Sequence, residues 1–580
     1  MRKAFLFPFL VLGTASFACS SSSGNGTPDA GTPLKDTGTA DHATIHVEAS
    51  TMKDTGTTPK EAGKPPSDAA SDVTKSDAGP PPTPAGTSIE KGLLAIEGVT
   101  GDGYLIYANA TTVKAVPEAG GTAITLIDAG EAGSMNGLYA EVLNDDVFIW
   151  TNVDSNTGAS TLTLWNHTLL STPKMVSTTS LPFVAAASDD STAIVFATGV
   201  SADGTTVGLS GATITSLATP TSLVAGIDPG GQMSTCPPSV TFSGKGASLY
   251  AVVGSCKPAV TDGGTDGPLS VVSFPTATWT GAALATGATA FSIDDTGVSA
   301  AITLATGQLE IVPLAGGTPI VIDSGPDGGT ALGMYSFLSK KDSFVLYNTS
   351  AGALTSSKVT ASAPVTLLAS GATEIDGLPA SEAFALVDTG FDQNTGLLTG
   401  LALASTATAN TSTAFVTGTD EAGMFGDAFT SDSKYVIYLA NITPDDNMDN
   451  VGTLTAAAVA TPATPITVAA KSGSTNQNGS LGIGGLEFGN LSNFLAGGSS
   501  ATDYAVPGGS KIVFVDNFTS DNGQVGQVDL KVVDLSTTTA AVTVMKSADP
   551  MFALTPDGKY IIYTITFGGA TDGLYTVAVP

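Results

Sequence analysis

The sequence predicts an all-β protein built from a repeated unit, and three observations support this. Apolar residues occupy 42% of the 580 positions, which is enough to bury a sizeable core, whereas charged residues occupy only 13%. Gly, Thr, Ser and Ala fill much of the remainder, a mixture that suits short strands and tight turns better than salt-bridged helices. From residue 88 onwards, short runs of β-branched and aromatic residues recur between turn-forming clusters.

Residues 1–18 predict a secretory signal. A basic start precedes an apolar stretch over residues 4–15, and the small residues Ser16 and Ala18 stand just before Cys19. The apolar stretch is shorter than the roughly 20 residues that span a bilayer. We therefore expect cleavage rather than a membrane-spanning helix.

The block "MRKAFLFPFLVLGTASFAC" resembles a bacterial lipoprotein signal, in which the cysteine after the cleavage point is lipidated and becomes the first residue of the mature chain. The resemblance implies that Cys19 carries a lipid, although Ser16 stands where the family prefers leucine. By the same resemblance, Ser20 after the cysteine does not hold the protein at an inner membrane, so we expect an anchor in the outer membrane that faces the periplasm or the surface. We expect no other contact with a membrane. The alternative is cleavage that leaves a free thiol on a secreted protein.

Residues 19–87 predict a lipidated, disordered tether. Their composition shifts to Ser, Thr, Pro, Gly, Asp and Lys, as in "SSSSGNGTPDAGTP" and "SDAGPPPTPAG". Such a run lacks the apolar surface that offsets chain entropy, so it holds a folded body away from its anchor. His42 and His46 lie within it at a spacing of four, but without the glutamate and apolar helix of a zinc protease site, and we interpret them as solvated.

The charge balance bears on the class of partner. The formal charge is −31, and removing residues 1–18 leaves 19 basic against 52 acidic residues, or −33. We expect no nucleic-acid partner, because phosphate binding depends on Lys and Arg. Arg2 is also the only arginine of the chain, so the mature protein has no guanidinium clamp for anions. Cationic ligands, Ca²⁺ among them, fit this charge better.

The cysteines predict one disulfide, because assigning Cys19 to lipid leaves only Cys236 and Cys256. These two lie ten residues either side of Gly246 in "CPPSVTFSGKGASLYAVVGSC", where two apolar runs flank a turn. Folding this hairpin about its turn places the two cysteines opposite each other, within a residue or so of register. An oxidising compartment favours the bond, and two unpaired buried thiols are the alternative.

A turn followed by an apolar and aromatic strand occurs ten times, mostly 40 to 55 residues apart, with one gap of 77 residues. The ten units are 100–109, 143–152, 188–198, 243–253, 294–303, 339–349, 379–389, 430–440, 507–516 and 555–564. A period in this range, with several short strands per unit, predicts a β-propeller of four-stranded blades over residues 88–580. We expect about ten units in a single ring; a smaller irregular ring or two rings are the alternatives.

The last unit, "ALTPDGKYIIYT…DGLYTVAV", resembles the TolB-like propeller repeat, a relative of WD40 units, in its Thr-Pro-Asp-Gly-Lys turn and in the strands that follow. The resemblance implies the propeller fold and is also clear at 430–438. Pro556 presets φ, Asp557 can bond its own backbone and Gly558 tolerates positive φ, so we interpret this turn as structure rather than chemistry. Rings of this kind commonly close with a strand from the other terminus, and we expect residues 88–99 to complete the last blade.

One loop has the spacing of a calcium site. By analogy with propellers, the loops between second and third strands lie on one face, and several carry acids and amides, as in "NITPDDNMDNVG". Asp445, Asn447 and Asp449 in this loop have the one-three-five spacing of an oxygen cage for Ca²⁺. The loop departs from an EF-hand at Asn450, where glycine is wanted, and at Ala456, where the closing glutamate belongs. A solvated hairpin loop without any cofactor is the competing interpretation.

Nucleophile chemistry finds little support in the sequence. Gly-x-Ser-x-Gly, phosphate-loop, His-Glu-x-x-His and Cys-x-x-Cys motifs are absent, and the one histidine of the body, His167, is interpreted as a structural blade residue. We expect a monomeric cell-envelope lipoprotein whose propeller is a non-catalytic binding or scaffold module for a protein, peptide or glycan. The alternative is an extracytoplasmic hydrolase or lyase that uses paired carboxylates, with or without Ca²⁺.

Overall fold

The computed structural model describes residues 84–92, 95–109, 111–128, 138–229, 236–258, 267–325, 336–349, 352–372, 374–377, 381–392, 397–423, 429–444, 450–470, 505–519, 527–537, 540–549, 552–566 and 570–580. The predicted signal, Cys19 and the tether as far as residue 83 lie outside these ranges. Within them, no helix has both the length and the apolar character needed to cross a membrane.

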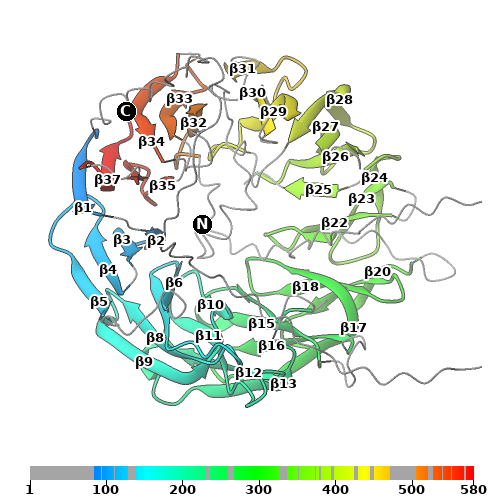
Figure 1. Ribbon diagram of the computed structural model, residues 1–580. Helices are drawn as coiled ribbons and strands as arrows, with labels where there is room; N and C mark the ends of the chain where they lie inside the picture. The colour runs from blue at the N-terminus through cyan, green and yellow to red at the C-terminus, as the bar shows by residue number, and fades with distance from the viewer. Residues whose placement is uncertain are drawn as a thin grey trace, which may run out of the picture. The chain divides into compact units, whose positions relative to one another are not determined.

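The described chain folds into a β-propeller of ten blades, numbered here in chain order (Figure 1). Each blade is an antiparallel sheet with strands A to D, strand A towards the middle of the ring and strand D at its rim. The first three blades are β2 (Ala95–Val99), β3 (Tyr104–Ala108), β4 (Thr112–Pro117) and β5 (Ile124–Asp128); β6 (Leu138–Leu143), β7 (Asp146–Thr151), β8 (Ser160–Asn166) and β9 (Leu170–Ser180); and β10 (Ala185–Ala187), β11 (Ala193–Thr198), β12 (Val207–Thr213) and β13 (Thr221–Ile227).

Blades 4 and 5 form one seven-stranded sheet, because β17 serves both. It pairs with β16 through residues 282–288 and with β18 through residues 288–293, so it is strand D of blade 4 and strand A of blade 5. The strands of this sheet are β14 (Ser239–Ser243), β15 (Tyr250–Ser255), β16 (Leu269–Pro275), β17 (Ala282–Ile293), β18 (Ser299–Leu304), β19 (Leu309–Pro313) and β20 (Ile320–Asp323). Single 3₁₀ turns occur at Ile214–Ser216 and Gly246–Ser248.

Blades 7 and 8 also form one seven-stranded sheet, because β28 pairs with both β27 and β29. An isolated bridge from Phe429 to Val436 adds to strand A of blade 8. Blade 9 has a similar bridge from Ala505 to Ile512. The remaining strands are β21 (Ser336–Leu338), β22 (Phe344–Asn348), β23 (Leu354–Lys358) and β24 (Val365–Leu368) in blade 6; β25 (Glu374–Gly377), β26 (Phe384–Asp392), β27 (Leu397–Ser405), β28 (Ser412–Gly423), β29 (Tyr435–Pro444), β30 (Asn450–Ala458) and β31 (Ile466–Ala469) in blades 7 and 8; β32 (Lys511–Thr519), β33 (Gln527–Asp534) and β34 (Val542–Ala548) in blade 9; and β35 (Phe552–Leu554), β36 (Tyr560–Ile565) and β37 (Gly573–Ala578) in blade 10.

Apolar residues that alternate along the strands hold neighbouring blades together. In β7, Val147 and Ile149 face blade 1, whereas Phe148 and Trp150 face blade 3, and all four side chains are fully buried. Successive side chains of a strand point to opposite faces of its sheet, so an apolar run such as this one serves two cores. This explains why the central strands of the repeat are continuously apolar rather than alternating.

A buried apolar cluster fills each junction in turn, from blades 1 and 2 to blades 9 and 10. The circuit closes because Leu105 and Tyr107 of blade 1 pack against Ile562 and Leu574 of blade 10. The described chain therefore forms a single ring of ten blades, as the ten repeat units predicted. This is the β-propeller fold that the resemblance of the repeat to TolB-like and WD40-like units implied.

The first and last described strands meet in blade 10. Strand β1 (Thr87–Lys91) pairs antiparallel with the C-terminal β37 and supplies strand D (Figure 1). The expectation that residues 88–99 form the closing strand is right only for β1, since β2 is strand A of blade 1. Gly92 ends β1 at φ +109°, a conformation that L-residues rarely adopt, and this breaks the segment in two.

Three side chains, which we call the clasp, join this closing strand to blade 1. The carboxylate of Glu90 on β1 accepts hydrogen bonds from Lys114 Nζ on β4 (2.6 Å) and from Tyr107 Oη on β3. Burial acts to raise the pKa of Glu90, but the hydrogen bonds from Lys114 and Tyr107 and the charge of Lys114 together lower it. The clasp therefore links the first and last blades through an ionised glutamate.

Candidate functional site

Alternating strand directions give the ring two faces. The A–B and C–D turns lie on one, which we call the turn face, and the B–C and D–A connections lie on the other, the loop face. On the turn face, His167 of a C–D turn bonds to Asp102 of an A–B turn. On the loop face, the Gly199 N–H of a B–C loop donates to Thr179 Oγ1 near the end of a strand D (3.1 Å).

Acidic side chains on the turn face build the turns. In blade 10, Asp557 Oδ1 accepts hydrogen bonds from Thr555 Oγ1 (2.8 Å) and from the Lys559 N–H (2.9 Å). Thr555 Oγ1 accepts in turn from the Tyr560 N–H (3.1 Å), where β36 begins. Gly558 follows at φ +70°, which favours glycine. This confirms the interpretation of the Pro-Asp-Gly turn as structure.

Asp432 shows that these turns also tie neighbouring blades together. Its Oδ1 accepts from Thr430 Oγ1 (2.8 Å) within blade 8, and its Oδ2 accepts from Ser510 Oγ (2.6 Å) in blade 9. Its N–H donates to Gly509 O (3.2 Å). Burial opposes ionisation, but hydrogen bonds from Ser510, Lys434 and Thr430 outweigh it and lower the pKa of Asp432 to about 2. A carboxylate engaged in this way is a poor general acid or base at neutral pH.

His167 belongs to a hydrogen-bonded chain between blades 1 and 2. Its Nδ1 lies 3.2 Å from Asp102 Oδ2, and its Nε2 lies 2.9 Å from Tyr104 Oη. Thr168 Oγ1 donates to the same oxygen of Asp102 (3.3 Å), and the Tyr104 ring packs edge-on against Trp165 at 5.7 Å. The hydroxyl on Nε2 is therefore a packed phenol, not the serine of a hydrolase triad. The cluster supports a structural role in joining two blades.

Asp146 is a buried acid beside this cluster. Its Oδ1 accepts a hydrogen bond from Asn166 Nδ2 (2.9 Å), and the side chain has no exposed surface. Burial raises the pKa of Asp146 to about 7; hydrogen bonds from Asn166 and Ser191 oppose this shift, and the charges of Asp145 and Asp102 add to it. Because a substrate cannot reach it, Asp146 affects stability rather than chemistry.

Two glutamates occupy the innermost strands of adjacent blades. Glu97 lies at a bulge of β2 between Ile96 and Gly98. Glu141 of β6 lies opposite Phe148 of β7. Both residues are half-buried, and Glu141 Oε2 is enclosed without a hydrogen-bond partner among the described residues. Burial raises the pKa of Glu97 to about 7 and that of Glu141 to about 8. Both carboxyls can therefore hold a proton near neutral pH, as a general acid must.

Phe183 is an exposed aromatic residue on the loop face between blades 2 and 3. It is 42% exposed and has a φ of +61°, which is unusual for a bulky side chain. Its ring centroid lies 5.2 Å from that of Tyr139 and 5.6 Å from that of Trp150. Trp150 is fully buried, and its Nε1 donates to Ser180 Oγ (3.3 Å). We call Phe183, Tyr139 and Trp150 the aromatic patch.

Two B–C loops near this patch carry rigid carboxylates. Asp154 Oδ1 accepts hydrogen bonds from the N–H groups of Asn156 (2.9 Å) and Thr157 (2.8 Å). Asp203 Oδ1 accepts from Ser201 Oγ (2.6 Å) in the loop of the next blade. Turn hydrogen bonds lower the pKa of both exposed carboxyls, that of Asp203 to about 2. Both side chains are therefore fixed negative charges at the surface.

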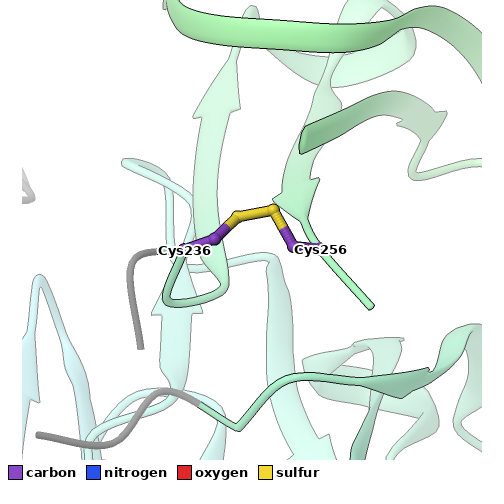
Figure 2. The surroundings of a disulfide bond; sticks show 2 residues. All are labelled: Cys236 and Cys256. Atoms are coloured by element: carbon purple, nitrogen blue, oxygen red, sulfur yellow. A yellow bond between two sulfur atoms is a disulfide. The ribbon is translucent and has the colours of Figure 1, made fainter. Parts of the chain in front are cut away.

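Cys236 and Cys256 form the predicted disulfide, at the loop-face end of blade 4 (Figure 2). Their Cα atoms are 5.9 Å apart. Because Ser239 lies opposite Gly254 in the β14–β15 pair, the two cysteines are one residue out of register, as the hairpin argument allowed. The Asp228 N–H donates to Cys256 O (3.0 Å). This hydrogen bond links the disulfide-bonded end of β15 to the segment that follows β13 of blade 3.

The other site residues predicted from the sequence lie outside the described residues. These are the lipidation site Cys19 and the calcium ligands Asp445, Asn447 and Asp449. Within the described ranges, no group of three or more His, Cys, Asp or Glu side chains is placed to hold a metal ion. The lipid anchor and the calcium site therefore stay predictions.

Sequence reasoning did not single out Phe183, Glu97 or Glu141. The glutamates had a signal, since each interrupts an otherwise apolar strand, in "AIEGV" and "LYAEVL". For Phe183 the signal was weaker: Pro182 marks a turn, where an aromatic residue is unexpected. A polar residue inside an apolar strand, or an aromatic residue inside a turn, therefore marks a position to consider as a candidate site residue.

Comparisons with known proteins give no family for the chain. No family model matches the sequence, and no curated protein does. Among solved structures, the chain is similar to the C-terminal WD40 domain of Sif2 (11% identity, 86% of this chain, 99% of that one, TM-score 0.33), a eukaryotic initiation factor (13%, 67%, 91%, 0.40) and the β-propeller domain of the Trilobed protease from Pyrococcus furiosus (10%, 60%, 94%, 0.28). Likenesses at this level say nothing about activity, and the propeller fold rests on the blade pairing of the chain itself.

Proposed function

We propose that the propeller is a non-catalytic binding or scaffold module for a protein, peptide or glycan, and that it engages this partner through the loop face. The aromatic patch carries the proposal. Phe183 exposes an apolar ring to water and has a left-handed backbone conformation, and each of these features costs free energy. An aromatic residue held on a rigid base is typical of recognition surfaces. Among the described residues with exposed large apolar side chains, Phe183 is the one aromatic residue, and it lies on the loop face.

We further propose that this module is a monomeric lipoprotein of the cell envelope. The support is the signal sequence with Cys19 and Ser20, together with the bond between Cys236 and Cys256, which forms in oxidising compartments. In this proposal a lipid on Cys19 anchors the chain in the outer membrane, and the partner belongs to the cell envelope. A secreted form without the lipid is the alternative.

Metabolic labelling with an alkyne fatty acid tests the anchor. The wild type should take up the label and sediment with membranes, whereas Cys19→Ala should do neither, because the thiol that accepts the lipid is gone. Cys236→Ser is the matched control and should keep the label. An unlabelled wild-type protein in the soluble fraction would contradict the lipoprotein proposal.

Affinity capture followed by reconstitution tests the binding function. Residues 84–580 are immobilised, envelope extract is passed over them, and the affinity of each purified partner is then measured by calorimetry. The wild type should bind a partner that Phe183→Asn releases, and asparagine tolerates a positive φ, so the fold is kept. Asp557→Asn on the turn face is the control and should bind like the wild type. Equal affinity for the wild type and Phe183→Asn would count against the proposal.

Glu97 and Glu141 favour a second candidate function, a hydrolase or lyase that acts on an extracytoplasmic glycan. Their raised pKa values suit a general acid, and the loop with Asp445, Asn447 and Asp449 is where Ca²⁺ would bind. The test is release of reducing ends or unsaturated sugars from a polysaccharide panel, which Glu141→Gln should abolish. Activity that survives in Glu141→Gln would exclude this residue as the acid.

A further inference from the structure

We propose that the aromatic patch binds a lysine or arginine side chain on an extended segment of a partner protein. The inference rests on the proposed binding function of the loop face and specifies the chemistry of the partner. Two independent features carry it: the exposed aromatic ring of Phe183, and the sign of the charge around it.

The first feature is an aromatic ring that is both fixed and accessible. Phe183 contacts two other rings, and Trp150 beneath it is held by its hydrogen bond to Ser180. Even so, Phe183 keeps 42% of its surface in water, so part of its π system is available to a ligand. A cation over such a ring gains about 0.5–1 kcal/mol at an exposed site and about 2 kcal/mol when water is excluded.

The second feature is that three surface segments meet at this point. The residues 152–159, 181–184 and 199–206 contact one another closely. A Cβ atom at Gly158 would lie 3.0 Å from Leu181 Cδ1, and one at Gly204 would lie 3.1 Å from Thr157 Cα. The loops that carry Asp154 and Asp203 are therefore neighbours of the turn that carries Phe183.

The charge on these three segments has one sign. They contain Asp154 and Asp203 but no lysine or arginine, and the hydrogen bonds that lower the pKa of both carboxyls keep them ionised. The mature chain carries −33 as a whole, so an anionic ligand is repelled. A neutral sugar could donate hydroxyl hydrogen bonds to these carboxylates but gains nothing from their charge, whereas a cationic side chain is attracted both by the ring and by the charges.

Calorimetry with a defined peptide tests this inference. The probe is Gly-Ser-Lys-Gly-Ser-Lys-Gly-Ser-Lys-Gly, and its control is the same peptide with acetyl-lysine, both titrated into residues 84–580 at 150 mM NaCl. We expect the lysine peptide to bind and the acetylated one not to. Phe183→Asn should weaken binding about fivefold or more, because a loss of about 1 kcal/mol corresponds to that factor. Phe183→Trp keeps an aromatic ring at this position and should bind the lysine peptide as the wild type does.

Charge variants separate a specific site from general attraction to an acidic protein. Asp154→Asn combined with Asp203→Asn should weaken binding severalfold, whereas Asp557→Asn on the turn face should leave it unchanged. Equal binding by Phe183→Asn, or equal binding of the acetylated peptide, would overturn the inference. Binding of a neutral oligosaccharide, cellohexaose, that depends on Phe183 in place of the lysine peptide would also overturn it, yet would leave the proposed binding function standing.

Discussion

Removing the carboxylate of the clasp should loosen the closure of the ring. Glu90→Ala deletes the group that accepts hydrogen bonds from Lys114 and Tyr107, and so cuts the polar link between β1 and blade 1. The pairing of β1 with β37 and the packing of Ile89 against the apolar cluster between blades 10 and 1 stay in place. The expected result is therefore local opening of β1, not unfolding of the ring.

The size of this effect follows from the geometry of the clasp. Hydrogen bonds to charged groups contribute about 1.5–3 kcal/mol each. The side chains of Glu90 and Lys114 are 27% and 24% exposed, so water and salt screen part of this interaction, and Lys114 can hydrate once its partner is gone. The net cost should be about 2–3 kcal/mol, equivalent to roughly 30- to 140-fold more frequent opening of β1.

Hydrogen exchange measured by mass spectrometry is the assay, because it reports local opening by segment. Peptides that cover β1 and β37 should exchange faster in Glu90→Ala, while peptides from blades 3 to 8 should not change. Lys434→Ala breaks an exposed ion pair with Asp432 and should leave β1 unaffected. Exchange of β1 within twofold of the wild type would refute the reasoning.

The clasp should also depend on pH with a definite sign. Because the pKa of Glu90 is lowered in the folded protein, its contribution is present above about pH 4.5, the usual value for a free glutamate, and is lost as the pH falls through the lowered value. Protection of β1 in the wild type should therefore fall in acid towards that of Glu90→Ala. Protection that stays constant down to pH 3 would contradict this.

Three further predictions concern stability. Since Asp146 has a pKa raised to about 7, the native state holds its proton more tightly than the unfolded chain, and stability should fall as the pH rises from about 4 to about 7; thermal melts of Asp146→Asn should lack this component, at most about 4 kcal/mol. Replacing both Cys236 and Cys256 by serine should cost about 3 kcal/mol for a loop of this length, seen as a lower guanidinium midpoint; an unchanged midpoint would contradict it. Gly86→Ala places a Cβ 2.0 Å from Thr576 O at a φ of +81°, so it should expose β1 to limited proteolysis, whereas Gly509→Ala meets open space and should not.

The number of blades could be predicted from the sequence because the repeat is a local signal. The A–B turn of blade 10, for example, is closed by hydrogen bonds between residues only two to five positions apart, Thr555, Asp557 and Tyr560. Each of the ten repeat units spans the connection between strands A and B of one blade, so ten units mark ten blades. The disulfide was predictable for the same reason, since one hairpin brings Cys236 and Cys256 together. Features set by local geometry leave their mark in a single stretch of sequence.

The shared strands and the aromatic patch could not be predicted in this way. Whether β17 serves one blade or two depends on partners on both of its sides. Tyr139 and Phe183 meet although 44 positions separate them, and His167 meets Asp102 over 65 positions. Such contacts depend on how neighbouring blades pack against each other, and the pattern of a single sequence does not determine that packing.

Photocrosslinking from the loop face tests the central functional claim most directly. The residue p-benzoyl-phenylalanine replaces Phe183 in one variant and the exposed Lys559 of the turn face in another, and both proteins are irradiated in intact cell envelopes. We predict a discrete covalent adduct from position 183 and none from position 559. Adducts from position 559 alone, or none from position 183, would contradict the assignment of the loop face as the binding face.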